Sequence, residues 1–326
     1  MYKAIRYEAY FNSGNKFAVS AGKNSITTGE NAVAVGEESI AMGDLTIALG
    51  RHNTAIGRQI LTRGYNAVGL GYGSTVTGIN AIAFNEAGKA LGYASLTLGD
   101  HCIAAGAYAV AGGFQSVATK QGAMAIGHLS EATARHATAI GQVTKANGAY
   151  CVVTGNQNTC SGTAALVSGY GNEVTGNYNL VSGTSNTVSG KTNIVGGNLN
   201  TISSTDGLVA GANNTVEGNY SSAFGRNNTI TGNTGLCVGI ENTVGGQANF
   251  VAGITNEVTG LQSIVGGSTN KVYATNTIVS GNNNTLQAKE DNEGTLRSDN
   301  SIVCGSQNVL NGAPYSMITG NSHEVS

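Results

Sequence analysis

The sequence predicts an all-β protein built as a repetitive solenoid, and three observations support this prediction. Glycine recurs every seventh residue from Gly22 to Gly281, with five exceptions in thirty-eight positions. No insertion or deletion breaks that register. Between the glycines, small and large apolar residues alternate, which is typical of a short strand followed by a turn. A period this strict indicates one small structural unit that is copied many times.

The glycines favour strands and turns over helices. A coiled coil also has a seven-residue period, but glycine in each heptad would destabilise a helix by about 1 kcal/mol per copy relative to alanine. A tight β-turn suits glycine, which tolerates positive φ and close backbone approach. The five exceptions are Asn85, Lys120, Ala134, Ser204 and Ala274. Asn85 fits a positive-φ position, whereas Ala134, Ser204 and Ala274 indicate a limit on size.

The composition argues against several classes of protein. Charged residues make up 10% of the chain, far below the roughly 25% of ordinary soluble domains, and apolar residues make up 40%. The net charge of −2 and the lack of a basic run give no support for binding nucleic acid or an anionic membrane. The sequence shows neither a signal peptide nor an apolar stretch long enough to span a membrane as a helix. We therefore expect neither nucleic acid nor membrane insertion among the interactions of the chain.

The cysteines indicate no metal or redox site. Their number is odd, their spacings match no zinc or CxxC pattern, and we expect them to fill small apolar positions in a chain that folds in a reducing compartment. They are Cys102, Cys151, Cys160, Cys237 and Cys304.

Each heptad can be numbered so that its glycine is position 7. In the segment from Glu37 to Gly43, positions 3, 5 and 7 are small, while positions 4 and 6 are Ile40 and Met42. In a strand, positions 3, 5 and 7 share one side and positions 4 and 6 share the other. Position 5 is mostly alanine in the first half and mostly valine from Val167 to Leu286, so we expect the core to become bulkier without a change of register.

The second half shows that the true repeat has fourteen residues. Asparagine occupies position 3 of every second heptad, starting at Asn158, and the next residue is often threonine. In the intervening heptads, position 4 is usually large and apolar. Fourteen residues with two strands and two turns form one coil of a flattened solenoid, in which successive coils are about 4.8 Å apart. We expect some twenty-two coils, with an internal asparagine column that hydrogen-bonds from coil to coil. This column comprises Asn172, Asn186, Asn200, Asn214, Asn228, Asn242, Asn256, Asn270 and Asn284.

The chain is predicted to have five parts. Residues 1–15 form an aromatic attachment or capping segment, residues 16–160 an alanine-core roll, and residues 161–288 a valine- and asparagine-core roll. Residues 289–298 form a charged loop insertion, because ten extra residues interrupt the period there. Residues 299–326 form the final coils. We expect one continuous body rather than domains joined by a linker.

The heptads resemble a known repeat. Ser39-Ile40-Ala41-Met42-Gly43 and Thr46-Ile47-Ala48-Leu49-Gly50 are similar to the head repeat of trimeric autotransporter adhesins of the YadA-like, Hep/Hag type. The resemblance covers about residues 20 to 160 closely, and the asparagine-threonine heptads look like a variant. It implies a left-handed parallel β-roll, three copies of which pack side by side along a shared axis. The sequence shows no export signal, stalk or membrane barrel of the kind found in that family, so we expect a phage fibre that uses the same repeat unless the chain is an excised fragment.

The apolar outer column is the strongest candidate for an interaction surface. Such a column exposes on the order of 1,000 Å², more than a monomer usually leaves uncovered. We expect it to be the seam of a homotrimer; contact with a different protein is the alternative. It comprises Leu166, Leu180, Ile194, Leu208, Leu236, Phe250, Ile264 and Ile278.

Two further segments are candidates for contacts with other molecules. The N-terminal aromatic segment would dock to other virion proteins, fold over an apolar patch or cap the first coil. It comprises Tyr2, Ile5, Tyr7, Tyr10 and Phe11. The charged loop is a candidate contact for a host surface glycan or protein, because binding residues concentrate on loops, although a solvated insertion without a partner is the simpler interpretation. It contains Lys289, Glu290, Asp291, Glu293 and Arg297.

The sequence therefore predicts a structural protein rather than an enzyme. The five histidines form no ligand cluster, and no nucleophile elbow, Walker loop or catalytic carboxylate pair is evident, so no catalytic residue, metal or cofactor is expected. The favoured hypothesis is a virion fibre, made in the host cytoplasm, that decorates a phage particle and adheres to the host surface. The alternative is the excised head of a bacterial surface adhesin. An ice-binding solenoid is a remote alternative, suggested by the column of threonines.

Overall fold

The computed structural model describes residues 18–290, 296–297 and 300–326. The described part of the chain consists of strands and turns without a helix, and forms a parallel β-solenoid of about 21 turns with coils of about fourteen residues. Residue contacts divide the chain into two compact units, 1–157 and 158–326. The predicted all-β solenoid is confirmed.

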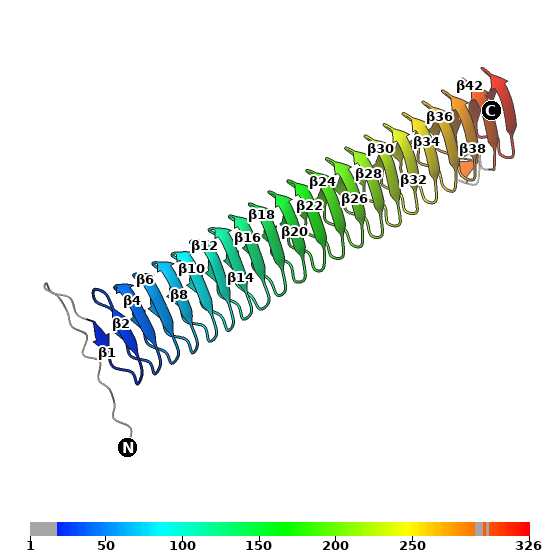
Figure 1. Ribbon diagram of the computed structural model, residues 1–326. Helices are drawn as coiled ribbons and strands as arrows, with labels where there is room; N and C mark the ends of the chain where they lie inside the picture. The colour runs from blue at the N-terminus through cyan, green and yellow to red at the C-terminus, as the bar shows by residue number, and fades with distance from the viewer. Residues whose placement is uncertain (1–17, 291–295, 298–299) are drawn as a thin grey trace. The chain divides into compact units, whose positions relative to one another are not determined.

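In the first unit, two-residue and longer strands alternate along the chain. Figure 1 labels β1 and the longer strands. The two-residue strands are β1 (Val19–Ser20), β3 (Val33–Ala34), β5 (Ile47–Ala48), β7 (Leu61–Thr62), β9 (Thr75–Val76), β11 (Lys89–Ala90), β13 (Ile103–Ala104), β15 (Val117–Ala118), β17 (Glu131–Ala132) and β19 (Lys145–Ala146). The longer strands are β2 (Ile26–Thr28), β4 (Ile40–Asp44), β6 (Thr54–Arg58), β8 (Val68–Tyr72), β10 (Ile82–Glu86), β12 (Leu96–Asp100), β14 (Val110–Phe114), β16 (Met124–His128), β18 (Thr138–Gln142) and β20 (Val152–Asn156).

The second unit repeats this alternation. Its shorter strands are β21 (Thr159–Cys160), β23 (Glu173–Val174), β25 (Thr187–Val188), β27 (Thr201–Ile202), β29 (Thr215–Val216), β31 (Thr229–Ile230), β33 (Thr243–Val244), β35 (Glu257–Val258), β37 (Lys271–Val272), β39 (Thr285–Gln287), β43 (Val309–Asn311) and β45 (Glu324–Val325). Its five-residue strands are β22 (Leu166–Tyr170), β24 (Leu180–Thr184), β26 (Ile194–Asn198), β28 (Leu208–Ala212), β30 (Ser222–Arg226), β32 (Leu236–Ile240), β34 (Phe250–Ile254), β36 (Ile264–Ser268), β38 (Ile278–Asn282), β42 (Ile302–Ser306) and β44 (Met317–Asn321). The inserted loop contains β40 (Lys289–Glu290) and β41 (Leu296–Arg297), which pair in antiparallel orientation.

Equivalent strands of successive coils pair in parallel. Ile40 of β4 lies opposite Thr54 of β6, and Leu180 of β24 lies opposite Ile194 of β26, fourteen residues further on in each case. The register continues past the insertion, where Ile278 of β38 pairs with Ile302 of β42. Each coil therefore stacks on the one before it through a ladder of backbone hydrogen bonds.

The two heptads of a coil differ in strand length, which the prediction of two short strands per coil did not include. The position-7 residues near the ends of the longer strands have positive φ, as at Gly43 (φ 119°) and Asn85 (φ 91°). Gly36, which follows a two-residue strand, does not have positive φ. At Gly36 the limit is space, because a Cβ there would overlap the carbonyl group of Gly50 in the next coil. Asn85 thus occupies a positive-φ position as expected, and Ala134, Ser204 and Ala274 lie in the other class.

The regular left-handed position of each turn is position 2, not the glycine. Residues there have φ close to 55° and include Leu45, Val143, Tyr150 and Thr192. A β-branched residue in this conformation is unusual, since a Cβ costs about 1–2 kcal/mol there. The turn is held by the coil-to-coil ladder, in which the position-2 amide donates to the preceding coil, as Tyr150 N–H does to the carbonyl of Arg135 at 3.0 Å.

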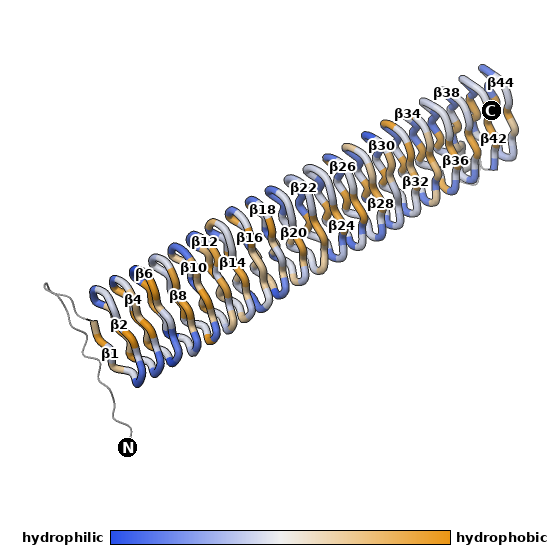
Figure 2. The backbone as a smooth tube through the Cα atoms, viewed as in Figure 1, coloured by the Kyte–Doolittle hydropathy of each residue, from blue (hydrophilic) through white to orange (hydrophobic). Residues whose placement is uncertain are grey.

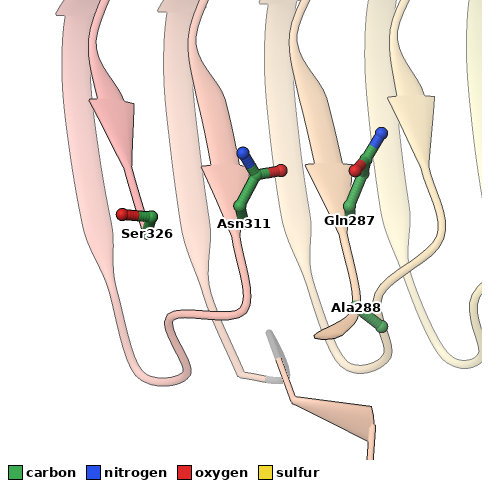
Figure 3. Close-up of a pocket in the computed structure, with 4 residues that line it drawn as sticks. All are labelled: Gln287, Ala288, Asn311 and Ser326. Carbon is green, nitrogen blue, oxygen red and sulfur yellow. The ribbon is translucent and has the colours of Figure 1, made fainter. Parts of the chain in front are cut away.

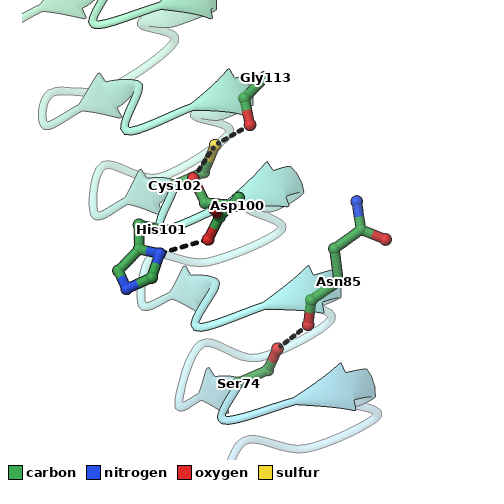
Figure 4. A network of polar contacts seen from close by, with 6 residues as sticks. All are labelled: Ser74, Asn85, Asp100, His101, Cys102 and Gly113. Carbon is green, nitrogen blue, oxygen red and sulfur yellow. Dashed lines mark hydrogen bonds and ion pairs between the residues drawn. The ribbon is translucent and has the colours of Figure 1, made fainter.

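The interior is filled by positions 3 and 5. Ser39 and Ala41 in the first unit and Asn186 and Val188 in the second are fully buried. Position-3 side chains also donate hydrogen bonds to the carbonyl groups of position-7 residues. Ser74 Oγ, for example, donates to the carbonyl of Asn85 at 3.0 Å (Figure 4). Buried carbonyl groups need such donors, so polar residues at position 3 stabilise the turns.

The cysteines mostly occupy these interior positions. Cys102, Cys151, Cys160 and Cys237 are buried, and Cys102 Sγ donates to the carbonyl of Gly113 at 3.3 Å (Figure 4). Cys304 departs from the expectation that all five fill internal positions. It lies at an outward position of β42 and is half-buried.

Candidate functional site

In the second unit, an apolar column runs along the outward face of the five-residue strands. Leu166, Leu180 and Ile194 align in register from β22 to β26, with exposed fractions of 44%, 42% and 52%. Leu208, Phe250, Ile264 and Ile278 are also exposed, and Leu236 is half-buried. Figure 2 shows the hydrophobic colouring that recurs along these strands. The name apolar column is used below for the eight residues, from Leu166 to Ile278, that were predicted to form the seam.

A column of smaller residues lies beside the apolar column. Two residues further along the same strands, position 6 is Ser182, Gly196, Ala252 or another small residue in most coils. Where the apolar column is interrupted by Ser222, position 6 is Phe224. The face therefore carries a column of mostly large apolar side chains beside a column of mostly small ones.

The first unit has a wider apolar face that the seam prediction did not include. Position 4 and position 6 of its longer strands are both largely apolar, and the exposed side chains there include Met42, Ile56, Leu98, Ile126 and Ile140. The sequence of the first half contains the pattern that indicates this wider face, because large apolar residues occupy both outward positions of its fourteen-residue period. Near its N-terminal end, Val35 and Leu49, which directly follow the two-residue strands β3 and β5, are also apolar and exposed.

The opposite face of the second unit is polar. Thr187, Thr201, Thr215, Thr229 and Thr243 occupy the first position of five successive two-residue strands and align in register. We call these five residues the threonine column. Charged residues flank it: Glu173 precedes it, and Glu257 and Lys271 follow it. In most coils of this stretch, one side is thus apolar and the other carries a threonine.

The structure places the asparagine column in the interior. Asn200 Nδ2 donates to Oδ1 of Asn186 at 2.9 Å and to the carbonyl of Gly211 at 2.9 Å. Asn214 repeats this arrangement with Asn200, and Asn308 continues it across the insertion by donating to Oδ1 of Asn284 at 3.0 Å. Each amide is therefore both donor and acceptor, which gives the column a structural role.

The other predicted contact segments are only partly described. The N-terminal aromatic segment lies outside the described residues, as do Asp291 and Glu293 of the charged loop. In that loop, the backbone of Lys289 lies opposite that of Arg297, and that of Glu290 lies opposite that of Leu296.

The described residues do not form a catalytic centre that geometry can identify. Among them, no group of three or more His, Cys, Asp or Glu side chains could hold a metal ion. Burial raises the pKa of Cys102 and raises that of Cys237 to about 12, which makes both thiols poor nucleophiles. His101 contacts Asp100 on an exposed turn (Figure 4).

A hollow beside the insertion is lined by side chains without a charged or strongly nucleophilic group. It is lined by Gln287, Ala288, Asn311 and Ser326, whose side chains are amides, a methyl group and a hydroxyl (Figure 3). The described part of the chain also contains no helix of the length and apolar character that a membrane span requires.

Comparisons with known proteins support the repeat resemblance. The profile of the YadA head domain repeat matches residues 16–39, 63–84 and 118–144. The profile of the grass antifreeze beta roll matches residues 138–211. No curated protein matches the chain. Together with the parallel solenoid, these matches confirm the predicted resemblance to YadA-like head repeats.

Proposed function

We propose that this chain is an adhesin-like structural β-roll that acts as a homotrimer on the surface of a phage particle or a bacterial cell, where it mediates attachment to a host. The resemblance to adhesin head repeats supports an adhesive, surface-exposed role. The roll is proposed to be left-handed, as the resemblance implies. No residue arrangement in the described part of the chain favours an enzymatic role over a structural one.

The apolar column is the observation that carries the proposal. Its side chains are 40–52% exposed at Leu166, Leu180, Ile194, Leu208, Phe250, Ile264 and Ile278, although the same residue types are normally buried. The adjacent column of mostly small residues leaves room for large side chains of an identical chain, and packing of this kind excludes water from apolar surface on both copies. A second copy is therefore the occupant that fits this face best.

The oligomeric state tests this proposal. Leu180→Asp and Ile194→Asp in one chain would bury two uncompensated charges at each seam, so the trimer is expected to give monomer or aggregate in analytical ultracentrifugation. Thr187→Asp and Thr201→Asp form the matched control on the opposite face and are expected to leave the trimer intact. A trimer that survives the first pair of substitutions refutes the seam. Immunogold labelling then decides between a phage particle and a bacterial cell as the carrier.

Ice binding is a second candidate function, because two observations favour it. The profile of the grass antifreeze beta roll matches residues 138–211, and the threonine column provides a regular hydroxyl array in five successive coils. Thermal hysteresis of the purified chain that is reduced by Thr201→Lys and Thr215→Lys would support this function. Absence of thermal hysteresis would exclude it.

A further inference from the structure

One turn of the first unit carries an unusual set of side chains in five successive coils. This turn follows the two-residue strands β11, β13, β15, β17 and β19. At positions 7, 1 and 2 it presents the residues that we call the tyrosine–arginine ridge: Tyr93, Tyr108, Lys120, Arg135, His136 and Tyr150. Backbone bonds place them coil by coil, since Tyr108 N–H donates to the carbonyl of Tyr93 at 2.7 Å and His136 N–H to that of Gln121 at 2.9 Å.

The aromatic rings of the ridge are exposed and held in place. Tyr93, Tyr108 and Tyr150 are 45%, 57% and 53% exposed. Tyr93 and Tyr108 meet edge to face with ring centroids 5.4 Å apart, and the ring of His136 stacks on Tyr150 at 5.4 Å with an interplanar angle of 22°. Paired rings lose less conformational freedom on binding, so they form prepared platforms for a flat apolar face.

Gly122 explains how His136 reaches its position. A side chain at Gly122 would overlap the imidazole of His136, so the glycine leaves room for the ring to lie over the preceding coil. The histidine is thereby placed between Gly122 and Tyr150. This arrangement extends the aromatic surface across the coils that separate Tyr108 from Tyr150.

The ridge is positively charged, unlike the chain as a whole. The fifteen residues at positions 7, 1 and 2 of these five coils include Lys120 and Arg135 and no aspartate or glutamate. The chain has a net charge of −2. Arginine and lysine bind carboxylate and sulfate groups by charge-assisted hydrogen bonds, and the amide of Gln121 on the same turn adds donor and acceptor groups.

We propose that the tyrosine–arginine ridge binds a linear acidic glycan that lies along the stack of coils. The apolar faces of its sugar rings contact the tyrosines, and its acidic groups pair with Lys120 and Arg135. The coil spacing of about 4.8 Å is close to the advance of one sugar residue in an extended chain, so five coils accommodate about four residues. A polymer in which every second sugar is acidic places about two charges on the ridge.

The charge count favours a glycan over single-stranded nucleic acid, which also stacks on aromatic rings. The ridge spans about 19 Å, and a nucleic acid strand carries a phosphate on every nucleotide, whereas a polymer with an acid on every second sugar carries fewer charges over this length. Two cationic side chains match the sparser charge of an acidic polysaccharide. This assignment names a ligand class for the proposed adhesive function but does not depend on the trimer.

Binding of the full chain to immobilised hyaluronan and unsulfated chondroitin, in which every second sugar carries a carboxylate, tests the proposal, with neutral dextran and single-stranded poly(dT) as comparisons. We expect binding to at least one acidic glycan and weaker binding to dextran and poly(dT). Tyr108→Ala with Tyr150→Ala is expected to weaken glycan binding by about tenfold or more. Arg135→Gln is expected to reduce the preference for the acidic glycan over dextran.

Tyr178→Ala with Tyr220→Ala provides the matched control, because these exposed tyrosines occupy the same turn position in the second unit. The control is expected to bind like the unsubstituted chain. Equal loss in both pairs, tighter binding to poly(dT), or no binding to either acidic glycan overturns the proposal. Ultracentrifugation of the same samples separates this failure from a failure of the trimer, because the ridge substitutions leave the apolar column unchanged.

Discussion

The backbone N–H and the side-chain amide of Asn200 both donate to the same oxygen, Oδ1 of Asn186, at 3.0 and 2.9 Å. Asn214 binds Oδ1 of Asn200 in the same way, so each oxygen in the column accepts two hydrogen bonds from the next coil. A fully buried amide is costly unless all its groups are paired. The column therefore fixes the stacking register of the second unit.

Loss of one member of the column should be strongly destabilising. Asn200→Ala removes the acceptor of two bonds and leaves the buried Oδ1 of Asn186 and carbonyl of Gly211 without the Nδ2 donor. We expect the free energy of unfolding to fall by about 3–5 kcal/mol, measured by guanidinium unfolding of the full chain. Asn198→Ala, at an exposed neighbouring position, should change it by less than about 0.5 kcal/mol. Similar effects of the two substitutions would contradict a structural role for the column.

Two adjacent glycines should respond in opposite ways to alanine. Gly267 has φ 111°, and a Cβ there would overlap the carbonyl of Gly281 in the next coil, whereas a Cβ at Gly266 meets nothing within 4 Å. Gly267→Ala is therefore expected to lower the free energy of unfolding by about 3 kcal/mol. Gly266→Ala should raise it by about 0.4–1 kcal/mol, because it restricts the unfolded chain. Thermal and guanidinium unfolding of both variants measure the difference. Equal responses would refute the idea that the position-7 glycines are needed for the close approach of successive coils.

A substitution in the turn at Val143 should increase the stability of the protein. Val143 has φ 53°, where a β-branched side chain is disfavoured and asparagine is tolerated. We expect Val143→Asn to raise the free energy of unfolding by about 1 kcal/mol. Val152→Asn is the control, because Val152 is an exposed strand residue where asparagine is unfavourable. A loss of stability in Val143→Asn would show that the valine side chain packs usefully in the turn.

Alkaline pH should weaken the contribution of Cys237 to stability. Burial raises the pKa of its thiol from 9.0 to about 12, so above pH 9 the unfolded thiol ionises while the folded one stays protonated. The unfolded state then binds fewer protons, and the free energy of unfolding falls by up to about 1.4 kcal/mol per pH unit between these values. Cys237→Val lacks the thiol, and valine is the usual residue at this interior position 5 in the second unit.

Guanidinium unfolding at about pH 8 and about pH 10.5 measures this effect. Cys237→Val should gain stability relative to the unsubstituted chain as the pH rises, and a difference that stays constant would contradict the shifted pKa. Comparison of the two curves cancels the titration of the remaining groups, since they are shared by both proteins.

Much of the candidate surface was predictable because strand geometry links sequence position to side-chain direction. The alternation of Leu180 and Val181 identifies an outward and an inward residue, and the structure exposes the first and buries the second. The tyrosine–arginine ridge was not predicted. Tyr93 and Tyr108 are fifteen residues apart and differ in turn position, so only the folded turn shows that their rings meet.

The sequence by itself determined the period, the fourteen-residue coil and the identity of the interior positions, because side-chain alternation and a strict repeat depend only on local geometry. The tertiary structure decided that alternate heptads form five-residue and two-residue strands, and that position 2 rather than the glycine takes the regular left-handed conformation. Neighbouring coils impose both features. A turn residue such as Val143 accepts an unfavourable φ because the backbone ladder to the coils around it outweighs its local preference.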